Sequence, residues 1–211
     1  MKSKFIVIDG GDGAGKSTQI QKLKEYLGEK AFFSREPGGS PYAEMIRDVI
    51  LDPMGSESGA KTQCALFWAG RSDHLDKTII PALQNGKIVI LDRFDSSTFA
   101  YQLYGKNGLD EVSVERFFED RDFYLGDTKP DLYIYLDVDV ETGLKRKQSQ
   151  GDELNHFDTA SLEFRKRMRQ GFSDFFSNPR INTEVAIVDA NLSEDEVFGK
   201  IMMIVGNTIN S

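Results

Sequence analysis

Short apolar runs alternate with longer amphipathic stretches along the chain. Five runs of three to five residues lie at 5–8, 31–33, 87–91, 132–136 and 185–188. They do not alternate with polar residues, which is typical of strands covered on both faces. Helical segments separate them, including one at about 16–27 and a closing helix from about residue 193. The pattern predicts an α/β fold in three layers, with a mainly parallel five-stranded sheet flanked by helices.

Polar residues follow these predicted strands. A glycine-rich loop follows the first run, Arg35 and Glu36 follow the second, and Asp92 and Arg93 follow the third. Residues 137–139, which read DVD, follow the fourth. In open parallel sheets, ligands bind beyond the carboxyl ends of the strands. The sequence therefore predicts a functional site at this edge of the sheet.

Length and composition are those of an ordinary globular protein. The 211 residues fit one domain, 1–211, with 39% hydrophobic and 28% charged residues. No apolar run is long enough to span a membrane, and the run at 5–8 is too short for the core of a signal peptide. We therefore expect a cytoplasmic protein with no membrane partner.

Charge and cysteine usage narrow the function further. The formal net charge of −8 disfavours a nucleic acid polymer as a partner, because such a polymer is held through its phosphates. An acidic protein can still bind small phosphorylated ligands if its basic groups converge on one cleft. Cys64 is the only cysteine and lies in an apolar stretch, so we expect a buried, inert thiol and no disulfide.

Residues 10–17 read GGDGAGKS and match the phosphate-loop pattern G-x-x-x-x-G-K-[ST] between a predicted strand and a predicted helix. Glycines let backbone N–H groups surround phosphate oxygens, and the helix that follows points its positive end at the same anion. Lys16 is expected to bridge the β- and γ-phosphates, and the Ser17 hydroxyl to bind Mg²⁺. The residues expected to bind ATP are Gly10, Gly11, Asp12, Gly13, Ala14, Gly15, Lys16, Ser17 and Thr18.

The loop indicates a P-loop NTPase fold but does not separate a kinase from a GTPase or an ATPase motor. A GTPase would read guanine with an N-K-x-D segment after a later strand, whereas the nearest candidate, TKPD at 128–131, precedes the fourth run. A small-molecule kinase needs a second anion site facing the first. Arg35, Arg47, Arg71 and Arg93 are candidates for that site, so the sequence favours a kinase.

Two segments carry a more specific resemblance. Residues 5–18 read FIVIDGGDGAGKST, and residues 35–39 read REPGG. With further matches at 66–71, 92–102, 129–137 and 188–190, they resemble bacterial thymidylate kinase over nearly the whole chain. The resemblance implies a single P-loop kinase domain with a lid at about 145–158, and a homodimer. It implies the reaction ATP + dTMP → ADP + dTDP with Mg²⁺, in dTTP synthesis.

The resemblance implies a site for the thymine base. Phe67 matches the aromatic residue that stacks on the ring, and Arg71 matches the residue that donates to a thymine carbonyl. Gln102 can pair with the amide edge of the base, and its alternative is a buried glutamine satisfied by backbone. Thr98 lies where the family places a small polar residue near the base, and Tyr101 crowds the 2′ position and so disfavours ribonucleotides.

A sugar and phosphate site is implied as well. Asp12 matches the acid near the 3′-hydroxyl, with an acceptor for loop N–H groups as its alternative. Arg93 is expected to hold the acceptor phosphate and the developing charge. Arg47 and Arg35 are expected to help, although a solvated arginine on an amphipathic helix is the alternative for Arg47.

Acidic residues near the metal complete this site. Asp92 is expected to order Mg²⁺ through water or to orient Arg93. Glu36 matches the REPGG glutamate near the metal and the acceptor, with an ion pair to an arginine as its alternative. Pro37, the next residue of that segment, is expected to contact the substrate.

The lid departs from the family pattern. Many relatives carry arginines there, but this chain has Gln148, Gln150 and His156, and Gly13 stands where some relatives place an arginine of the phosphate loop. The expected catalytic cations are Lys16 and Arg93, with Arg146 as the lid cation. Lys147 is the second candidate for that role, Arg167 or Arg169 could face the donor phosphates, and His74 is expected to lie on a helix face.

Two alternatives remain at this point. A kinase for another nucleotide or for a deoxynucleoside would share the phosphate loop but not the REPGG segment combined with AYQ at 100–102. A catalytically impaired regulatory protein that binds nucleotides is favoured only by the altered lid.

Overall fold

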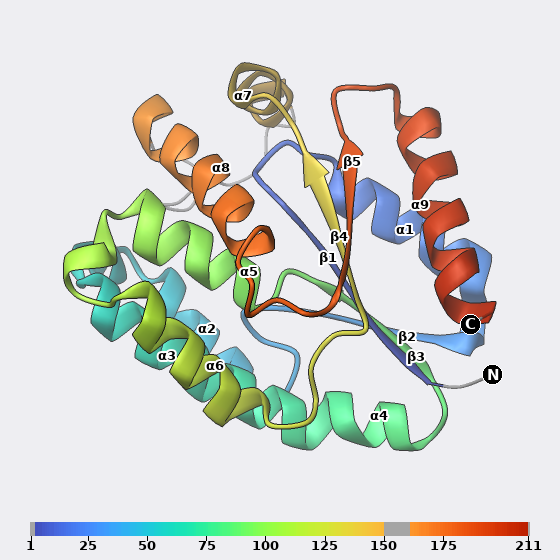
Figure 1. The fold of residues 1–211 in the computed structure, drawn as a ribbon, viewed down its shortest axis with the longest axis horizontal. Helices are drawn as coiled ribbons and strands as arrows, with labels where there is room; N and C mark the ends of the chain where they lie inside the picture. The colour runs from blue at the N-terminus through green and yellow to red at the C-terminus, as the bar shows by residue number, and fades with distance from the viewer. Residues whose placement is uncertain (1–2, 150–160, 211) are drawn as a thin grey trace.

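The computed structural model describes residues 3–149 and 161–210 (Figure 1). The strands of its sheet are β1 (Lys4–Gly10), β2 (Ala31–Arg35), β3 (Ile88–Asp92), β4 (Leu132–Asp137) and β5 (Glu184–Asp189). They form one five-stranded sheet in the order β2-β3-β1-β4-β5, and every pairing is parallel. The predicted α/β fold is confirmed, and each of the five predicted runs is a strand.

Helices connect the strands and cover both faces of the sheet (Figure 1). The α-helices of the described residues are α1 (Lys16–Leu27), α2 (Pro41–Leu51), α3 (Ala60–His74), α4 (Ile80–Gln84), α5 (Asp95–Thr98), α6 (Val114–Leu125), α7 (Val140–Ser149), α8 (Leu162–Phe176) and α9 (Glu194–Asn210). A π-helical segment, Leu75–Ile79, joins α3 to α4, and another, Phe99–Gly105, extends α5. Short 3₁₀ turns lie at Gly28–Lys30, Pro53–Glu57 and Gly108–Asp110.

The core has a layer on each side of the sheet. Phe5 and Val7 of β1 pack in one layer with side chains of α3, α6 and α8. Ile6 and Ile8 pack in the other layer with side chains of α1 and α9. Because successive side chains of a strand point to opposite faces, both sets must be apolar. This explains why the run at 5–8 shows no alternation.

The environment of Cys64 agrees with the sequence. Cys64 lies in the core, where burial raises the pKa of its thiol to about 12, so the thiol is inert at neutral pH. Within the described ranges, no helix has both the length and the apolar character needed to cross a membrane.

The segment at 128–131 leads into β4 and ties it to β1. The Asp131 carboxylate accepts a hydrogen bond from the Phe5 N–H at 2.7 Å, and the Asp131 N–H donates to the Phe5 carbonyl at 2.8 Å. An aspartate held in this way supports the sheet and is not presented to a base. The segment is therefore a strand start, as its position before the fourth run predicts.

Candidate active site

A cavity of about 350 Å³ opens beyond the carboxyl ends of β1, β2 and β3, at the predicted edge of the sheet. The predicted site residues that line it are Asp12, Gly13, Gly15, Lys16, Ser17, Thr18, Glu36, Pro37, Arg47, Phe67, Arg71, Asp92, Arg93, Tyr101 and Gln102. Arg35, Leu51, Phe94, Ser97 and Lys147 complete the lining. Segments far apart in the sequence thus meet at one cleft, which faces the phosphate loop.

The phosphate loop joins β1 to α1 and holds its lysine in a buried position. Lys16 Nζ donates to the carbonyl oxygens of Gly10 and Gly11 at 2.8 and 2.9 Å. Burial, together with the nearby Arg93 cation, lowers the pKa of Lys16 to about 8. A bound polyphosphate would favour the charged ammonium, because it brings negative charge to this buried group.

Gly13 allows the loop to approach α7. Its φ is 78°, and a Cβ atom at this position would lie 2.0 Å from the carbonyl oxygen of Gly143. A larger residue here, such as the arginine of some relatives, would therefore require α7 to move.

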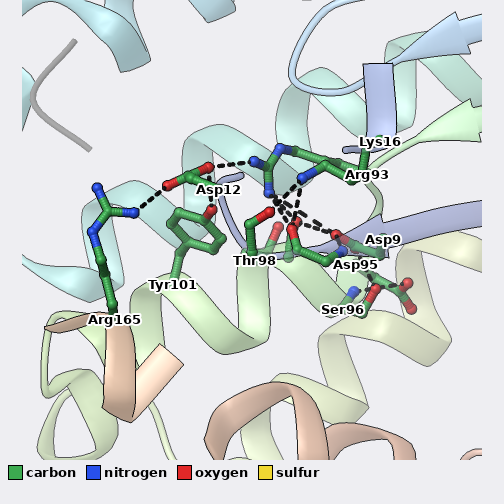
Figure 2. A network of polar contacts seen from close by, with 12 residues as sticks. Asp9, Asp12, Lys16, Arg93, Asp95, Ser96, Thr98, Tyr101 and Arg165 are labelled. Carbon is green, nitrogen blue, oxygen red and sulfur yellow. Dashed lines mark hydrogen bonds and ion pairs between the residues drawn. The ribbon is translucent and has the colours of Figure 1, made fainter. Parts of the chain in front are cut away.

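Arg93 and Asp12 are at the centre of a polar network across the cleft (Figure 2). Arg93 Nη2 donates to Asp12 Oδ1 at 2.7 Å, and Nη1 donates to Gly10 O and Ser97 Oγ, each at 3.2 Å. The Tyr101 hydroxyl donates to the same Asp12 oxygen at 2.9 Å. Arg93 and Tyr101 thus share the Asp12 carboxylate at the wall of the cavity.

The backbone of Arg93 is unusual. Its φ of 68° lies in the left-handed region, which is uncommon for residues other than glycine. The Arg93 N–H donates to the Ile8 carbonyl at 3.0 Å, which holds this conformation against the end of β1. Such outliers often lie at functional sites, where the surrounding structure stabilises them.

Arg165 of α8 binds Asp12 from the other side and is a residue that the sequence analysis missed. Arg165 Nη1 donates to Asp12 Oδ2 at 3.3 Å, and the arginine side chain is 3% exposed. Burial disfavours the Asp12 carboxylate, but Arg93, Lys16 and the other donors outweigh it and lower its pKa. Asp12 is therefore an anion at neutral pH.

A signal for Arg165 is present in the sequence. Arg165, Met168 and Phe172 are buried and have the i, i+3, i+7 spacing of one helix face. Arg167 and Arg169, the two arginines of this helix that were predicted to face the donor phosphates, have other partners. Arg167 donates to the carbonyls of residues 104 and 105, and Arg169 pairs with the carboxylates of residues 137 and 139.

Asp9 supports the phosphate loop and was also missed. It is fully buried, and its carboxylate accepts hydrogen bonds from Gly10 N at 2.8 Å, Ser97 Oγ at 2.7 Å and Ser96 Oγ at 2.6 Å. Burial raises the pKa of this carboxyl group, although the Arg93 cation and both serines oppose the rise. A charged residue at the end of an apolar strand was the available signal.

The base end of the cavity contains a buried arginine with fixed partners. Arg71 is 1% exposed, and its Nε donates to Glu36 Oε2 at 2.8 Å while its Nη2 donates to Thr98 Oγ1 at 3.0 Å. The guanidinium carbon lies 4.6 Å from the ring centre of Trp68 and 4.8 Å from that of Phe94. Glu36 thus has the ion pair that the sequence left open for it.

Two side chains of this region have buried polar atoms that lack a hydrogen-bond partner within the described residues. The atoms are Nη1 of Arg71 and both amide atoms, Oε1 and Nε2, of Gln102. The part of the backbone that is described therefore does not satisfy Gln102. Because buried unpaired polar groups are destabilising and rare, this pattern favours a ligand with complementary groups.

The remaining arginines and acids of the site have separate environments. Arg35 donates to both carboxylate oxygens of Glu44, at 3.1 and 3.0 Å. Arg47 lines the cavity and donates to the Pro37 carbonyl at 2.7 Å, so it is not a purely solvated arginine. Asp92 has a buried Oδ1 atom with no hydrogen-bond partner in the described part of the chain.

The structure does not bring Arg146 to the cavity. Its guanidinium donates to the carbonyls of residues 190–192, at 2.6 to 3.4 Å. Lys147 lines the cavity instead. Gln150, His156 and the lid positions 150–158 lie outside the described residues, as does the side chain of Gln148.

His74 lies on a face of α3, as predicted, and that face is buried. Its side chain is fully buried next to Glu36, a contact that the sequence did not indicate. The end of α3 packs against the loop at 36–40. No local sequence pattern indicates this contact.

A parallel sheet with a phosphate loop after its first strand, facing an arginine-rich cleft, defines a P-loop kinase of small phosphorylated molecules. The sequence model of the family "Thymidylate kinase" matches residues 8–201. The chain therefore belongs to the thymidylate kinase family.

Individual relatives agree over almost the full length. The chain is 40% identical over 204 residues to thymidylate kinase of Geobacillus sp. (strain WCH70), covering 94% of this chain and 93% of the relative. It is 36% identical to thymidylate kinase of Clostridium novyi (strain NT), covering 95% of this chain and 97% of the relative. The crystal structure of thymidylate kinase from Ehrlichia chaffeensis superposes with a TM-score of 0.73 at 30% identity, covering 98% of this chain and 99% of that one.

These findings confirm the expected enzyme class and activity. The protein is a kinase that phosphorylates dTMP, as the family does. The relatives named above are all thymidylate kinases, so they give no support to another nucleotide kinase or to a regulatory protein.

Proposed function

We propose that the cavity binds dTMP against ATP and Mg²⁺ and transfers the γ-phosphoryl group of ATP to it, giving dTDP for dTTP synthesis. The main support is the set of buried atoms on Arg71 and Gln102 that are unpaired within the described residues, in the cavity that Lys16 also lines. A pyrimidine with carbonyl and N–H groups matches these donors and acceptors.

For the base, Gln102 pairs with the N3–H and the neighbouring carbonyl of thymine, and Arg71 donates to a carbonyl. Thr98 acts indirectly, since it holds Arg71. Phe67 offers its ring for stacking from the cavity wall. If Arg71 donates to the C4 carbonyl of thymine, cytosine is rejected, because it presents an amino group at C4 where Arg71 requires an acceptor.

For the sugar and acceptor phosphate, Asp12 accepts from the 3′-hydroxyl, and Tyr101 fills the space at the 2′ position. Arg93 binds the acceptor phosphate, with Arg47, Arg35, Glu36 and Pro37 around it. The acceptor oxygen is already anionic, so no strong general base is needed. Alignment and neutralisation of charge then provide most of the catalysis.

For the donor, the loop 10–18 wraps the phosphates of ATP, and Lys16 bridges the β- and γ-phosphates. Mg²⁺ fits Ser17, whose side chain lines the cavity, and Asp92, whose buried Oδ1 is unpaired within the described residues. When bound, the ion neutralises charge on the transferring phosphates. For the further donor-side cation, Lys147 already lines the cavity, whereas Arg146, the first candidate from the sequence, would have to leave the carbonyls of residues 190–192 to reach it.

Turnover against a panel of acceptors tests this assignment. ADP release would be followed with ATP, Mg²⁺ and one of dTMP, dUMP, dCMP, AMP, GMP or thymidine. We expect the highest kcat/KM with dTMP and little turnover with dCMP. Preference for another acceptor would reject the roles of Phe67, Arg71 and Gln102, and ATP binding without turnover would reject catalysis.

We also propose that the chain acts as one domain, in the cytoplasm, with a lid at 145–158, and as a homodimer. An apolar stripe of α2 supports the dimer, because Tyr42, Met45 and Val49 are 59%, 63% and 56% exposed at i, i+3, i+7 spacing. Light scattering should give twice the chain mass, and Met45→Glu should give the monomer. A monomeric parent protein would reject the dimer.

A further inference from the structure

A chain of four side chains runs behind the base end of the cavity. Glu36 binds Arg71 through Oε2, and its other oxygen, Oε1, lies 3.2 Å from Nδ1 of His74. Nε2 of the same ring lies 2.8 Å from Ser34 Oγ. The His74 side chain is 0% exposed and does not line the cavity, so it can reach a substrate only through Glu36.

Hydrogen-bonding capacity assigns the role of Nδ1 of His74. A carboxylate accepts, so Nδ1 carries the hydrogen of this contact and donates to Glu36. Nε2 forms the other contact of the ring, with the Ser34 hydroxyl. Both nitrogens are therefore used, and each oxygen of Glu36 has a donor.

The loop that contains Gly39 packs closely over the ring. Gly39 has a φ of 92°, and a Cβ atom there would lie 2.2 Å from Nε2 of His74. The Gly39 carbonyl also accepts from Thr78 Oγ1 at 2.9 Å, which holds the loop against the π-helical segment Leu75–Ile79 after α3. The ring is thus enclosed between the loop and the end of β2.

We propose that His74 is a positioning residue for base recognition. It holds Oε1 of Glu36, which keeps Oε2 on Arg71 and so directs the unpaired Nη1 of Arg71 into the cavity. The inference rests on the proposed role of Arg71 at a thymine carbonyl. Without His74, one oxygen of the buried Glu36 carboxylate loses its donor. Because an unpaired buried oxygen is unfavourable, we expect the carboxylate to rotate and weaken its contact with Arg71.

Two amide substitutions separate positioning from packing. In His74→Asn the amide nitrogen takes the place of Nδ1, whereas in His74→Gln it reaches toward Nε2. We expect His74→Gln to raise KM for dTMP about 10-fold, with kcat and KM for ATP within about twofold, and to lower the preference for dTMP over dCMP. His74→Asn keeps the donor to Glu36 and should stay within about threefold of the parent protein.

Equal kinetics of the two variants, or a parallel rise of both KM values, would overturn the proposal. Thermal unfolding checks that each variant folds. If His74→Gln does not fold, Ser34→Ala decides, because it removes only the hydrogen-bond partner of Nε2. We expect a rise in KM for dTMP of about threefold, and an unchanged KM would reject the idea.

Arg71→Ala distinguishes this inference from the function on which it rests. If Arg71→Ala leaves KM for dTMP and the selectivity against dCMP unchanged, the proposed base site fails. If Arg71→Ala impairs both while His74→Gln changes neither, only the positioning role of His74 fails.

Discussion

Two arginine–carboxylate pairs line the same cavity. The N–O distance is the same in both pairs, but their exposure to solvent differs. Arg71–Glu36 and Arg93–Asp12 both have an N–O distance of 2.7 Å, yet the side chains are 0% and 5% exposed in the first pair and 22% and 11% exposed in the second. A buried pair has no water to replace a lost partner, whereas a partly exposed pair can exchange partners. We infer that the Arg71 side chain keeps its conformation when the ligand binds, and that the Arg93 side chain changes its hydrogen-bond partners when phosphate binds.

The largest effect is expected at the partly exposed pair. Arg93→Ala should lower kcat about 10³-fold at saturating ATP and dTMP, because it removes the guanidinium that joins Asp12 to the Gly10 carbonyl and is proposed to bind the acceptor phosphate. Arg93→Lys should lie between this variant and the parent protein, since lysine keeps the charge but loses the planar fork. A loss below tenfold in Arg93→Ala would show that Arg93 is not the main catalytic arginine.

The buried pair should be more important for stability. Glu36→Gln leaves the Arg71 cation buried without a counter-charge, and we expect the free energy of unfolding to fall by about 3 kcal/mol in urea titrations. Glu163→Gln is the matched control, because Glu163 pairs with Lys166 on the surface, where both side chains are more than half exposed. That change should be below about 0.5 kcal/mol. Equal losses of unfolding free energy in Glu36→Gln and Glu163→Gln would show that the buried Arg71–Glu36 pair is no more important for stability than a surface pair.

The protonation of Lys16 in the phosphate loop should make ATP binding depend on pH. In the free protein, burial places the pKa of Lys16 at about 8, so the ammonium is present below pH 8 and is lost as pH rises through it. Because ATP binds the charged form, its Kd should rise about tenfold between pH 7 and pH 9 in calorimetry with Mg²⁺. Lys16→Gln should bind ATP weakly, with little change over this range. A parent protein with constant affinity would contradict the low pKa.

The smallest effect concerns the third partner of Asp12. Arg165→Met removes one donor but leaves Arg93 and Tyr101 on the carboxylate, so KM for dTMP should rise only about threefold. Arg167→Met on the same helix is the control, because Arg167 donates only to backbone carbonyls among its described contacts. Steady-state kinetics compare the two. A rise as large as that of Arg93→Ala would make Arg165 a principal partner of Asp12.

The sequence by itself determined the strands, the phosphate loop and the edge of the sheet where the site lies. The helix predicted at 16–27 is α1, and the five apolar runs are the five strands. These features depend on neighbouring residues: apolar runs must be covered on both faces, and a glycine-rich loop before a helix presents backbone N–H groups that suit a phosphate. A long resemblance then indicated the family.

Only the tertiary structure decided which polar side chains share a partner. It placed Arg165 on Asp12, His74 on Glu36 and Arg146 on the carbonyls after β5. Each contact joins residues at least 38 positions apart. The choice depends on which helix face packs against which loop, and that follows from the burial of the whole core rather than from a local pattern.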